Sequence, residues 1–151
     1  MSDGSAHHRV NAAYPALALA LLLAAACGQR DSGDGVPPRW DPSAWTPAQI
    51  QQLESGRRLY AQKCAACHLA SGQGQIALGA PSLRGSAVAT GPVALHIGIV
   101  LNGRGNGAMP AFANALDTRS VADIINYERN AWGNNDPELV TAQQVEDMRR
   151  R

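Results

Sequence analysis

The chain has 151 residues, a formal net charge of +1 and only 5% aromatic residues. This length suggests one domain with appended segments, and the near-neutral charge argues against nucleic acid as a partner. With a single Phe and three Tyr among 15 glycines, a small domain has few large side chains to bury, so we expect another body to complete its core.

The N-terminal residues have the pattern of a secretory signal. Arg9 precedes an apolar run that ends in the small residues 24–26. The run is shorter than the roughly 20 residues that a membrane-spanning helix needs. We therefore expect residues 1–26 to be a signal peptide and the protein to be exported.

Cys27 closes "LLAAACG", which resembles the signal of a bacterial lipoprotein. Ala24 stands where that signal favours leucine, so a spare cysteine at an ordinary cleavage site is the alternative. We expect a lipidated Cys27 and a flexible tether over residues 27–45, which would anchor the protein at the periplasmic face of the bacterial inner membrane. Trp40 and Trp45 leave open an arm packed on the domain.

The first helix has a clear start. Thr46 suits the N-cap, Pro47 the first helical position and Gln49 a capping box, which predicts a helix from Pro47 to about Lys63. Its apolar face comprises Ile50, Leu53, Leu59 and Tyr60, with Gly56 as a small notch.

The rest of the chain alternates glycine-rich loops with helical patterns. Residues 69–91 predict a loop. The expected helices are Pro92 to about Leu101, one capped by Asp117 that ends at Trp132 and Gly133, and one with a Thr141–Gln144 capping box and a Val140–Val145 staple. No segment alternates as a strand does, so the domain reads as all-α.

Cys64, Cys67 and His68 form the motif "CAACH", for which three interpretations compete. A thioredoxin-like redox pair would need βαβ surroundings, and a zinc site would need four ligands. The third interpretation is covalent haem: both thiols lie within one turn, where each can add to one vinyl group, and His68 becomes the proximal ligand of the iron.

A second axial ligand is expected downstream in a loop. Met109 qualifies because Pro110 fixes the backbone after it, while Met148 lies in the polar terminal helix. An ordinary core methionine is the alternative for Met109. His96 lies mid-helix and is expected to be exposed or already hydrogen-bonded rather than a ligand.

Four segments in order, "CAACH", "GAPSLRG", "LNGRGNGAMPAF" and "VADIINYERNAWGN", resemble a class I cytochrome c domain over about residues 47–135. The resemblance implies an all-α class I cytochrome c fold, with helices wrapped around one covalent haem c and long glycine-rich loops. It further implies thioethers at Cys64 and Cys67, iron ligation by His68 and Met109, and a Pro81 carbonyl that accepts a hydrogen bond from the proximal imidazole.

The resemblance also implies that Gly56 and Tyr60 cross Ile124 and Tyr127 where the terminal helices meet. "RNAWGN" is most similar to cytochrome domains attached to respiratory oxidases and periplasmic dehydrogenases. We expect the cytochrome domain at residues 46–135 and a C-terminal helical extension at 136–151.

With both axial positions filled, no site is open to substrate, so we expect an electron carrier and not an enzyme. It would pass single electrons between respiratory or dehydrogenase partners, such as an oxidase, a dehydrogenase or a bc1-type complex. The alternative is a cytochrome c subunit integral to a terminal oxidase or dehydrogenase complex. A peroxidase or gas sensor would need Met109 to be displaced.

Residues 55–116 contain no Asp or Glu, whereas five basic residues fall there: Arg57, Arg58, Lys63, Arg84 and Arg104. This imbalance predicts a basic surface at the haem edge that docks on an acidic partner. Two haem propionates would offset part of the charge, which is the alternative explanation.

Overall fold

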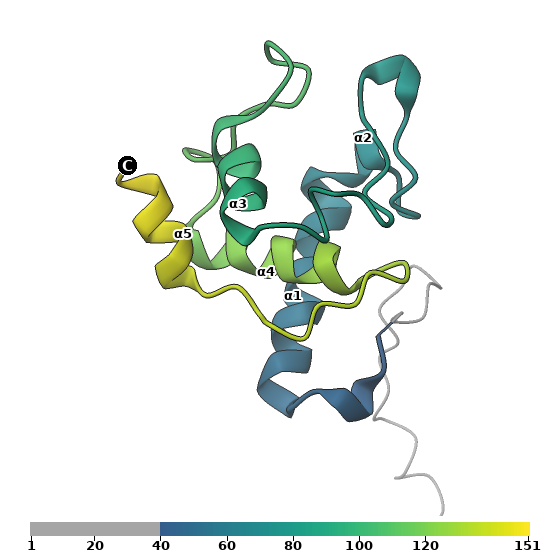
Figure 1. Ribbon diagram of the computed structural model, residues 1–151, viewed down its shortest axis with the longest axis vertical. Coiled ribbons are helices and arrows are strands. Elements are labelled where there is room, and N and C mark those ends of the chain that lie inside the picture. The colour runs from purple at the N-terminus through teal and green to yellow at the C-terminus, as the bar shows by residue number, and fades with distance from the viewer. Residues whose placement is uncertain (1–39) are drawn as a thin grey trace, which may run out of the picture. The chain divides into compact units, whose positions relative to one another are not determined.

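The computed structural model describes residues 40–151, and the expected signal peptide, Cys27 and most of the expected tether lie outside the described residues. The elements in chain order are η1 (Pro42–Ala44), α1 (Pro47–Lys63), α2 (Ala65–His68), η2 (Ile76–Leu78), α3 (Val93–Asn102), α4 (Thr118–Asn130) and α5 (Ala142–Arg149). No strand forms in this part of the chain, so the all-α prediction is confirmed (Figure 1).

The helix signals of the sequence are confirmed with small shifts. The Thr46–Gln49 and Thr141–Gln144 capping boxes both form, and α1 spans the predicted Pro47–Lys63. The third helix was expected to begin at Pro92, but Pro92 is the N-cap and α3 begins at Val93. The short helix α2 was not predicted separately, because Cys64 divides it from α1 by a single residue.

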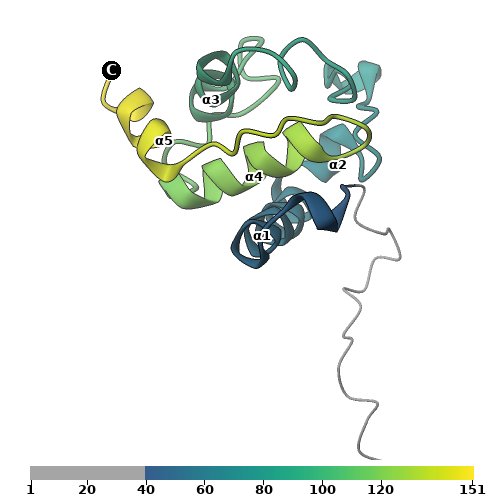
Figure 2. The same cartoon turned by 60° about the horizontal axis from the view of Figure 1, so that its bottom comes forward.

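Helices α1 and α4 cross in close contact (Figures 1 and 2). At the crossing, a Cβ added to Gly56 would lie 1.9 Å from the carbonyl oxygen of Asp123, so only glycine lets the two backbones come this near. The rings of Tyr60 and Tyr127 pack there with centroids 5.2 Å apart. The predicted crossing of the terminal helices is confirmed.

Trp40 belongs to the same aromatic group. It is 7% exposed, and its ring meets Tyr127 edge-on at a centroid distance of 6.1 Å. Trp45 also packs against this cluster. Trp40 and Trp45, at the end of the expected tether, therefore pack against the helices, as the alternative of a packed arm predicts.

A second core lies among α3, α4 and α5. Its buried members include Ile97, Val100, Leu101, Val121, Ile125, Val140 and Val145. Val140 and Val145 share this core, as the expected staple requires. Within residues 40–151 no helix is long and apolar enough to cross a membrane.

Candidate functional site

The thiols and imidazole of "CAACH" lie on one turn of backbone. Cys64 is the C-cap of α1, and the amides of Cys67 and His68 both donate to its carbonyl, at 3.1 and 2.9 Å. Cys64 is half-buried, Cys67 is exposed, and both are free thiols. The two sulfurs are therefore held close together and open to a bound group.

His68 is buried at the end of α2, and its ring is oriented by the loop that follows. Its Nδ1 lies 3.0 Å from the carbonyl oxygen of Pro81. Since a carbonyl only accepts, Nδ1 carries the hydrogen and Nε2 is left as the basic nitrogen. The side-chain amide of Gln75 fastens the same loop to α2 by donating to the carbonyls of Ala66 and Cys67, at 2.8 and 3.3 Å.

The backbone turns sharply after His68, and the core holds that turn. Leu69 has φ 61° and ψ 154°, a conformation that L residues rarely adopt. The hydroxyl of Tyr60 donates to the Leu69 carbonyl at 2.7 Å, and the indole of Trp132 donates to the Ala70 carbonyl at 2.9 Å. These two bonds keep the sharp turn, and with it the position of His68.

Met109 lies in a tight turn after α3. The backbone amides of Arg104 and Met109 donate to each other's carbonyls at 3.0 Å. Gly103 has φ 73°, and a Cβ there would lie 2.4 Å from the Met109 carbonyl oxygen. Glycine is thus needed for the chain to fold back on itself and present Met109.

These residues line one cavity of about 470 Å³, within the size range of pockets for small molecules and cofactors. Its lining contains Cys64, Cys67, His68, Pro81 and Met109. The remaining wall is mostly apolar and includes Leu83, Val88, Ile99, Val100, Phe112, Leu116 and Ile124. All five residues expected at the site from the sequence are therefore brought to one cavity.

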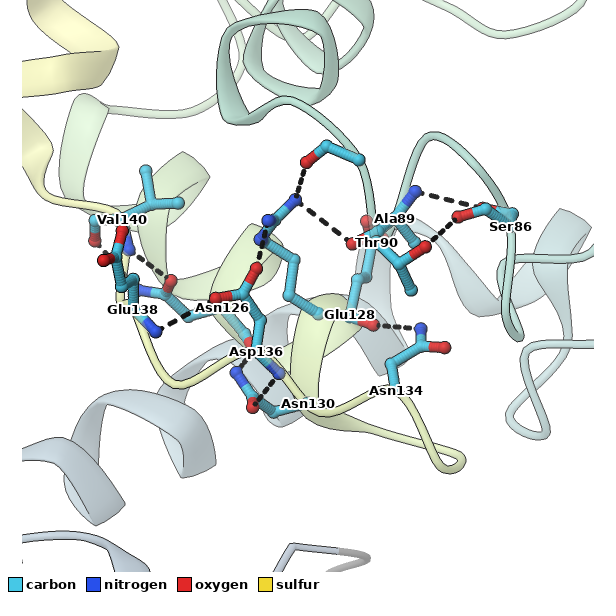
Figure 3. Close-up of polar contacts among 12 residues, drawn as sticks. Ser86, Ala89, Thr90, Asn126, Glu128, Asn130, Asn134, Asp136, Glu138 and Val140 are labelled. Atoms are coloured by element: carbon cyan, nitrogen blue, oxygen red, sulfur yellow. Dashed lines mark hydrogen bonds and ion pairs between the residues drawn. The ribbon is translucent and has the colours of Figure 1, made fainter.

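A loop that lines part of the cavity is held by residues of the "RNAWGN" segment. Figure 3 shows Asn130, Asn134 and Asp136 among the polar contacts of this region. Asn134 donates to the Leu83 carbonyl at 3.0 Å and accepts from the Gly85 amide at 2.7 Å. Arg129 donates to the Ala89 carbonyl at 3.2 Å, to that of Gly91 at 3.0 Å, and also pairs with Asp136.

Sequence reasoning used "RNAWGN" only as a point of resemblance and missed this role. The sequence signal that could have indicated this role is one Arg and two Asn near the end of a helix, because their side chains can donate hydrogen bonds to loop carbonyls. Arg129 and Asn134 position the loop of residues 83–91, from which Leu83 and Val88 reach the cavity.

A buried hydrogen-bond partner was also missed. His96 was expected to be exposed or already hydrogen-bonded. It is 2% exposed, and its Nε2 lies 2.8 Å from Glu128 Oε2. Both residues line the cavity. No sequence signal paired them, because they are 32 residues apart on different helices.

Burial and charge together shift two pKa values beside the cavity. Burial, followed by the charge of Glu128, raises the pKa of the Cys64 thiol well above its usual value. The same two causes raise the pKa of Tyr60. The Cys64 sulfur is therefore held as a thiol before any group is attached to it.

The residues of the cavity fit haem c. Two thiols on one turn match two vinyl groups, and an imidazole held through Nδ1 and a thioether sulfur are iron ligands. Among residues 40–151 no group of three or more His, Cys, Asp or Glu is placed to hold a metal, as the zinc interpretation would require. The apolar lining supplies the surroundings that a porphyrin face prefers.

Comparisons with known proteins agree with this geometry. Residues 51–127 match the family described as cytochrome c oxidase, cbb3-type, subunit III. The chain is 34% identical over 134 residues to the gluconate 2-dehydrogenase cytochrome c subunit of Pantoea cypripedii, covering 82% of this chain and 30% of that protein.

Two further relatives are similar over shorter matches. The chain is 30% identical to the cytochrome c subunit of a quinone alcohol dehydrogenase from Gluconacetobacter polyoxogenes, over 76% of this chain and 28% of the relative. It is 33% identical to the cbb3-type cytochrome c oxidase subunit CcoP of Azospirillum brasilense, over 53% of this chain and 28% of the relative. The chain thus spans under a third of the length of these relatives.

Proposed function

Because the chain belongs to the family of c-type cytochrome domains described as cytochrome c oxidase, cbb3-type, subunit III, we propose that its residues 46–135 form a monohaem electron-transfer domain. Members of this family carry covalent haem c, and the relatives include a cytochrome c subunit of a dehydrogenase and subunit CcoP of a cbb3-type cytochrome c oxidase. Haem c supplies an iron that exchanges single electrons.

The proposed attachment and ligand residues are those that line the cavity. Cys64 and Cys67 form the thioethers, His68 binds iron through Nε2, and Met109 binds it through its sulfur. The hydrogen bond from His68 Nδ1 to the Pro81 carbonyl carries this assignment, because it leaves Nε2 free in the wall that both thiols and Met109 share. Pro81 thereby orients the imidazole and tunes the iron through it.

Replacement of Met109 tests the assignment. The holoprotein should show a low-spin c-type spectrum, and Met109→Ala should abolish the methionine-to-iron charge-transfer band at the red end. Met148→Ala is the matched control, since Met148 packs against the core of α3, α4 and α5 and does not line the cavity. Survival of the band in Met109→Ala would overturn the ligand assignment.

The domain acts as a carrier in this proposal and performs no bond chemistry itself. It passes electrons between respiratory or dehydrogenase partners. A second candidate, a subunit built into an oxidase or dehydrogenase complex, is supported by the names of the relatives. Purification under conditions that preserve complexes distinguishes them: a stoichiometric large partner indicates the subunit, and isolation alone indicates the carrier.

We place the protein at the periplasmic face of the inner membrane. Residues 1–26 act as the signal peptide, Cys27 carries the lipid, the tether follows it, and residues 136–151 form the helical extension of the domain. The proposed signal peptide and lipid anchor are based on the sequence pattern before Gly28. The proposed extension contains α5.

Substitution of the lipid-bearing residue tests the tether. Cys27→Ser should move the protein from the membrane fraction to the soluble periplasmic fraction, because only a cysteine receives the acyl chains. The measurement is the haem-stained distribution between the two fractions. Unchanged membrane association would reject Cys27 as the anchor.

A further inference from the structure

His96 and Glu128 are a hydrogen-bonded polar pair in the mostly apolar wall of the cavity. The pair joins α3 to α4 through a contact of 2.8 Å, and its side chains are only 2% and 5% exposed. The surrounding positions on the same helices, such as Val100 and Ile124, are apolar. Burying a histidine and a carboxylate costs free energy that an apolar pair would not, so the pair is not explained by packing alone.

One nitrogen of this pair has no partner. If Glu128 is a carboxylate, its oxygen accepts and His96 Nε2 must carry the hydrogen. In the neutral ring Nδ1 is then an acceptor, and it is buried without a hydrogen-bond partner. A proton bound at Nδ1 would turn the imidazole into an imidazolium that faces a carboxylate, which is the arrangement that stabilises it.

Several charged or titratable groups share these surroundings. In the cavity lining they are Lys63, Cys64, Cys67, His68 and Arg104. Tyr60 of α1 and Cys64, the C-cap of that helix, interact with the Glu128 charge. On α4, Arg129 is already bound to two carbonyls and Asp136, and the Asp123 carboxyl faces Ser55 and Gln52 of α1. Helix α5 contributes no described residue to the lining.

The charge of Glu128 therefore reaches the groups around the cavity. Once both cysteines are thioethers they no longer titrate, and Lys63 and Arg104 are exposed, where solvent screens their charges. The His96–Glu128 pair is shielded from that screening because it is buried. Among the described residues the pair is therefore a buried titratable group in the cavity wall, where a charge change inside the cavity is little screened by solvent.

We propose that the His96–Glu128 pair is a redox-linked proton site, which binds one proton from solvent when the haem cavity gains an electron and releases it when the electron leaves. This inference rests on the proposed function. The electron comes from the redox partner, the proton adds at His96 Nδ1, and no other bond forms or breaks. The reduced state should therefore be favoured as the pH falls.

The test is an optical redox titration of the holoprotein across pH about 5 to 9, the range in which histidines titrate. At a fixed applied potential, the wild-type ratio of reduced to oxidised protein should rise as the pH falls, by at most about tenfold per pH unit for one proton per electron. The double variant His96→Gln, Glu128→Gln should lose most of this dependence. Glu128→Gln alone should favour the reduced form at neutral pH by about tenfold, because a buried negative charge is removed.

Glu146→Gln is the matched control. It makes the same chemical change on α5, where Glu146 pairs with Arg150 outside the cavity lining. Its pH dependence should equal that of the wild type. A double variant that keeps the full wild-type dependence would overturn the proposal.

A measurement on the unaltered chain covers the case in which the variants do not fold. With ¹⁵N-labelled histidine, the Nδ1 and Nε2 shifts of His96 report its protonation in each redox state. At matched pH, His96 should be more protonated in the reduced protein than in the oxidised one, and equal protonation in both states overturns the inference. Absence of a c-type spectrum would instead refute the proposed function, so the two failures are distinguishable.

Discussion

Single side chains hold the strained positions on which the site depends. Leu69 keeps φ 61° because its carbonyl is bound by the Tyr60 hydroxyl, and the next carbonyl is bound by Trp132. Trp132 itself has φ 58°, also unusual for a bulky residue. Such conformations persist where surrounding contacts determine them, which is what these two hydrogen bonds do beside His68.

Asp117 is a helix cap whose contribution to the free energy of unfolding depends on pH. Its carboxylate caps α4 by accepting from the Ser120 amide at 2.7 Å, and the bonds to Ser120 lower the pKa of Asp117. Asp117→Ala should therefore destabilise the holoprotein by about 1 kcal/mol at neutral pH. Because the folded pKa is the lower one, this contribution is complete above the unfolded pKa of about 3.9 and is lost as the pH falls through the folded value.

Denaturant unfolding of the holoprotein at neutral and acidic pH measures this effect. Asp117→Asn is the control, since asparagine caps about as well as aspartate but does not titrate. If the wild type and the alanine variant differed equally at both pH values, the carboxylate would not be the capping group.

At the scale of elements, two kinds of contact assemble the cavity. The backbones of helices α1 and α4 come into contact at Gly56, and Tyr60 of α1 and Tyr127 of α4 belong to the aromatic cluster. The long loops have little regular structure and instead attach to α4 and the residues after it through Arg129 and Asn134. The helices thus supply the rigid frame, and polar side chains fasten the loops to it.

Gly56→Ala tests the crossing. The new Cβ would lie 1.9 Å from a backbone oxygen that cannot rotate away, so the helices must separate. We expect a loss of at least about 2–3 kcal/mol in the free energy of unfolding of the holoprotein, or little folded protein.

Gly98→Ala is the matched control for that variant. Gly98 lies within α3, where an added Cβ would meet only Met148 Cε at 3.9 Å, an ordinary contact. Alanine should stabilise this helix by about 0.5–1 kcal/mol because it lowers the entropy lost on folding. Thermal melting of both variants checks the contrast, and equal effects would mean that Gly56 is not needed for close approach.

At the scale of the whole molecule, charge is distributed unevenly. Residues 55–116 lack acidic side chains, and exposed Lys63 and Arg104 line the cavity that would hold haem. Just before the lining residue Gly79 in the chain, Ile76 in η2 is 93% exposed and Leu78 is 54% exposed. We propose that this basic rim with its apolar tip docks on an acidic surface of the redox partner.

Electron transfer to the natural partner should therefore slow as salt rises, because salt shortens the Debye length to about 8 Å at physiological ionic strength. Arg84→Glu or Arg104→Glu should slow it further at low salt. Arg150→Glu is the control reversal, since Arg150 is the C-cap of α5 and does not line the cavity. If the stopped-flow rates changed neither with salt nor with either charge reversal, electrostatic docking would be wrong. An apolar docking face formed by Ile76 and Leu78 would then be the better explanation.

The sequence by itself determined the features that depend on neighbouring residues. Capping boxes predicted the start of α1 and α5, and the adjacent residues of "CAACH" predicted the cofactor and its attachment point. Met109 and Pro81 were placed by resemblance and lie in the cavity, although their roles remain predictions. These signals are readable because the interacting groups lie within a few residues of one another.

Only the tertiary structure decided which distant side chains meet. The bond between Asn134 and Leu83 joins residues 51 positions apart, and His96 meets Glu128 across 32. Trp40 likewise packs on Tyr127 although its own segment has no apolar period. In each case local sequence propensity does not identify the partner residue. The pairing depends on which surfaces of distant segments the packing of the helices brings together.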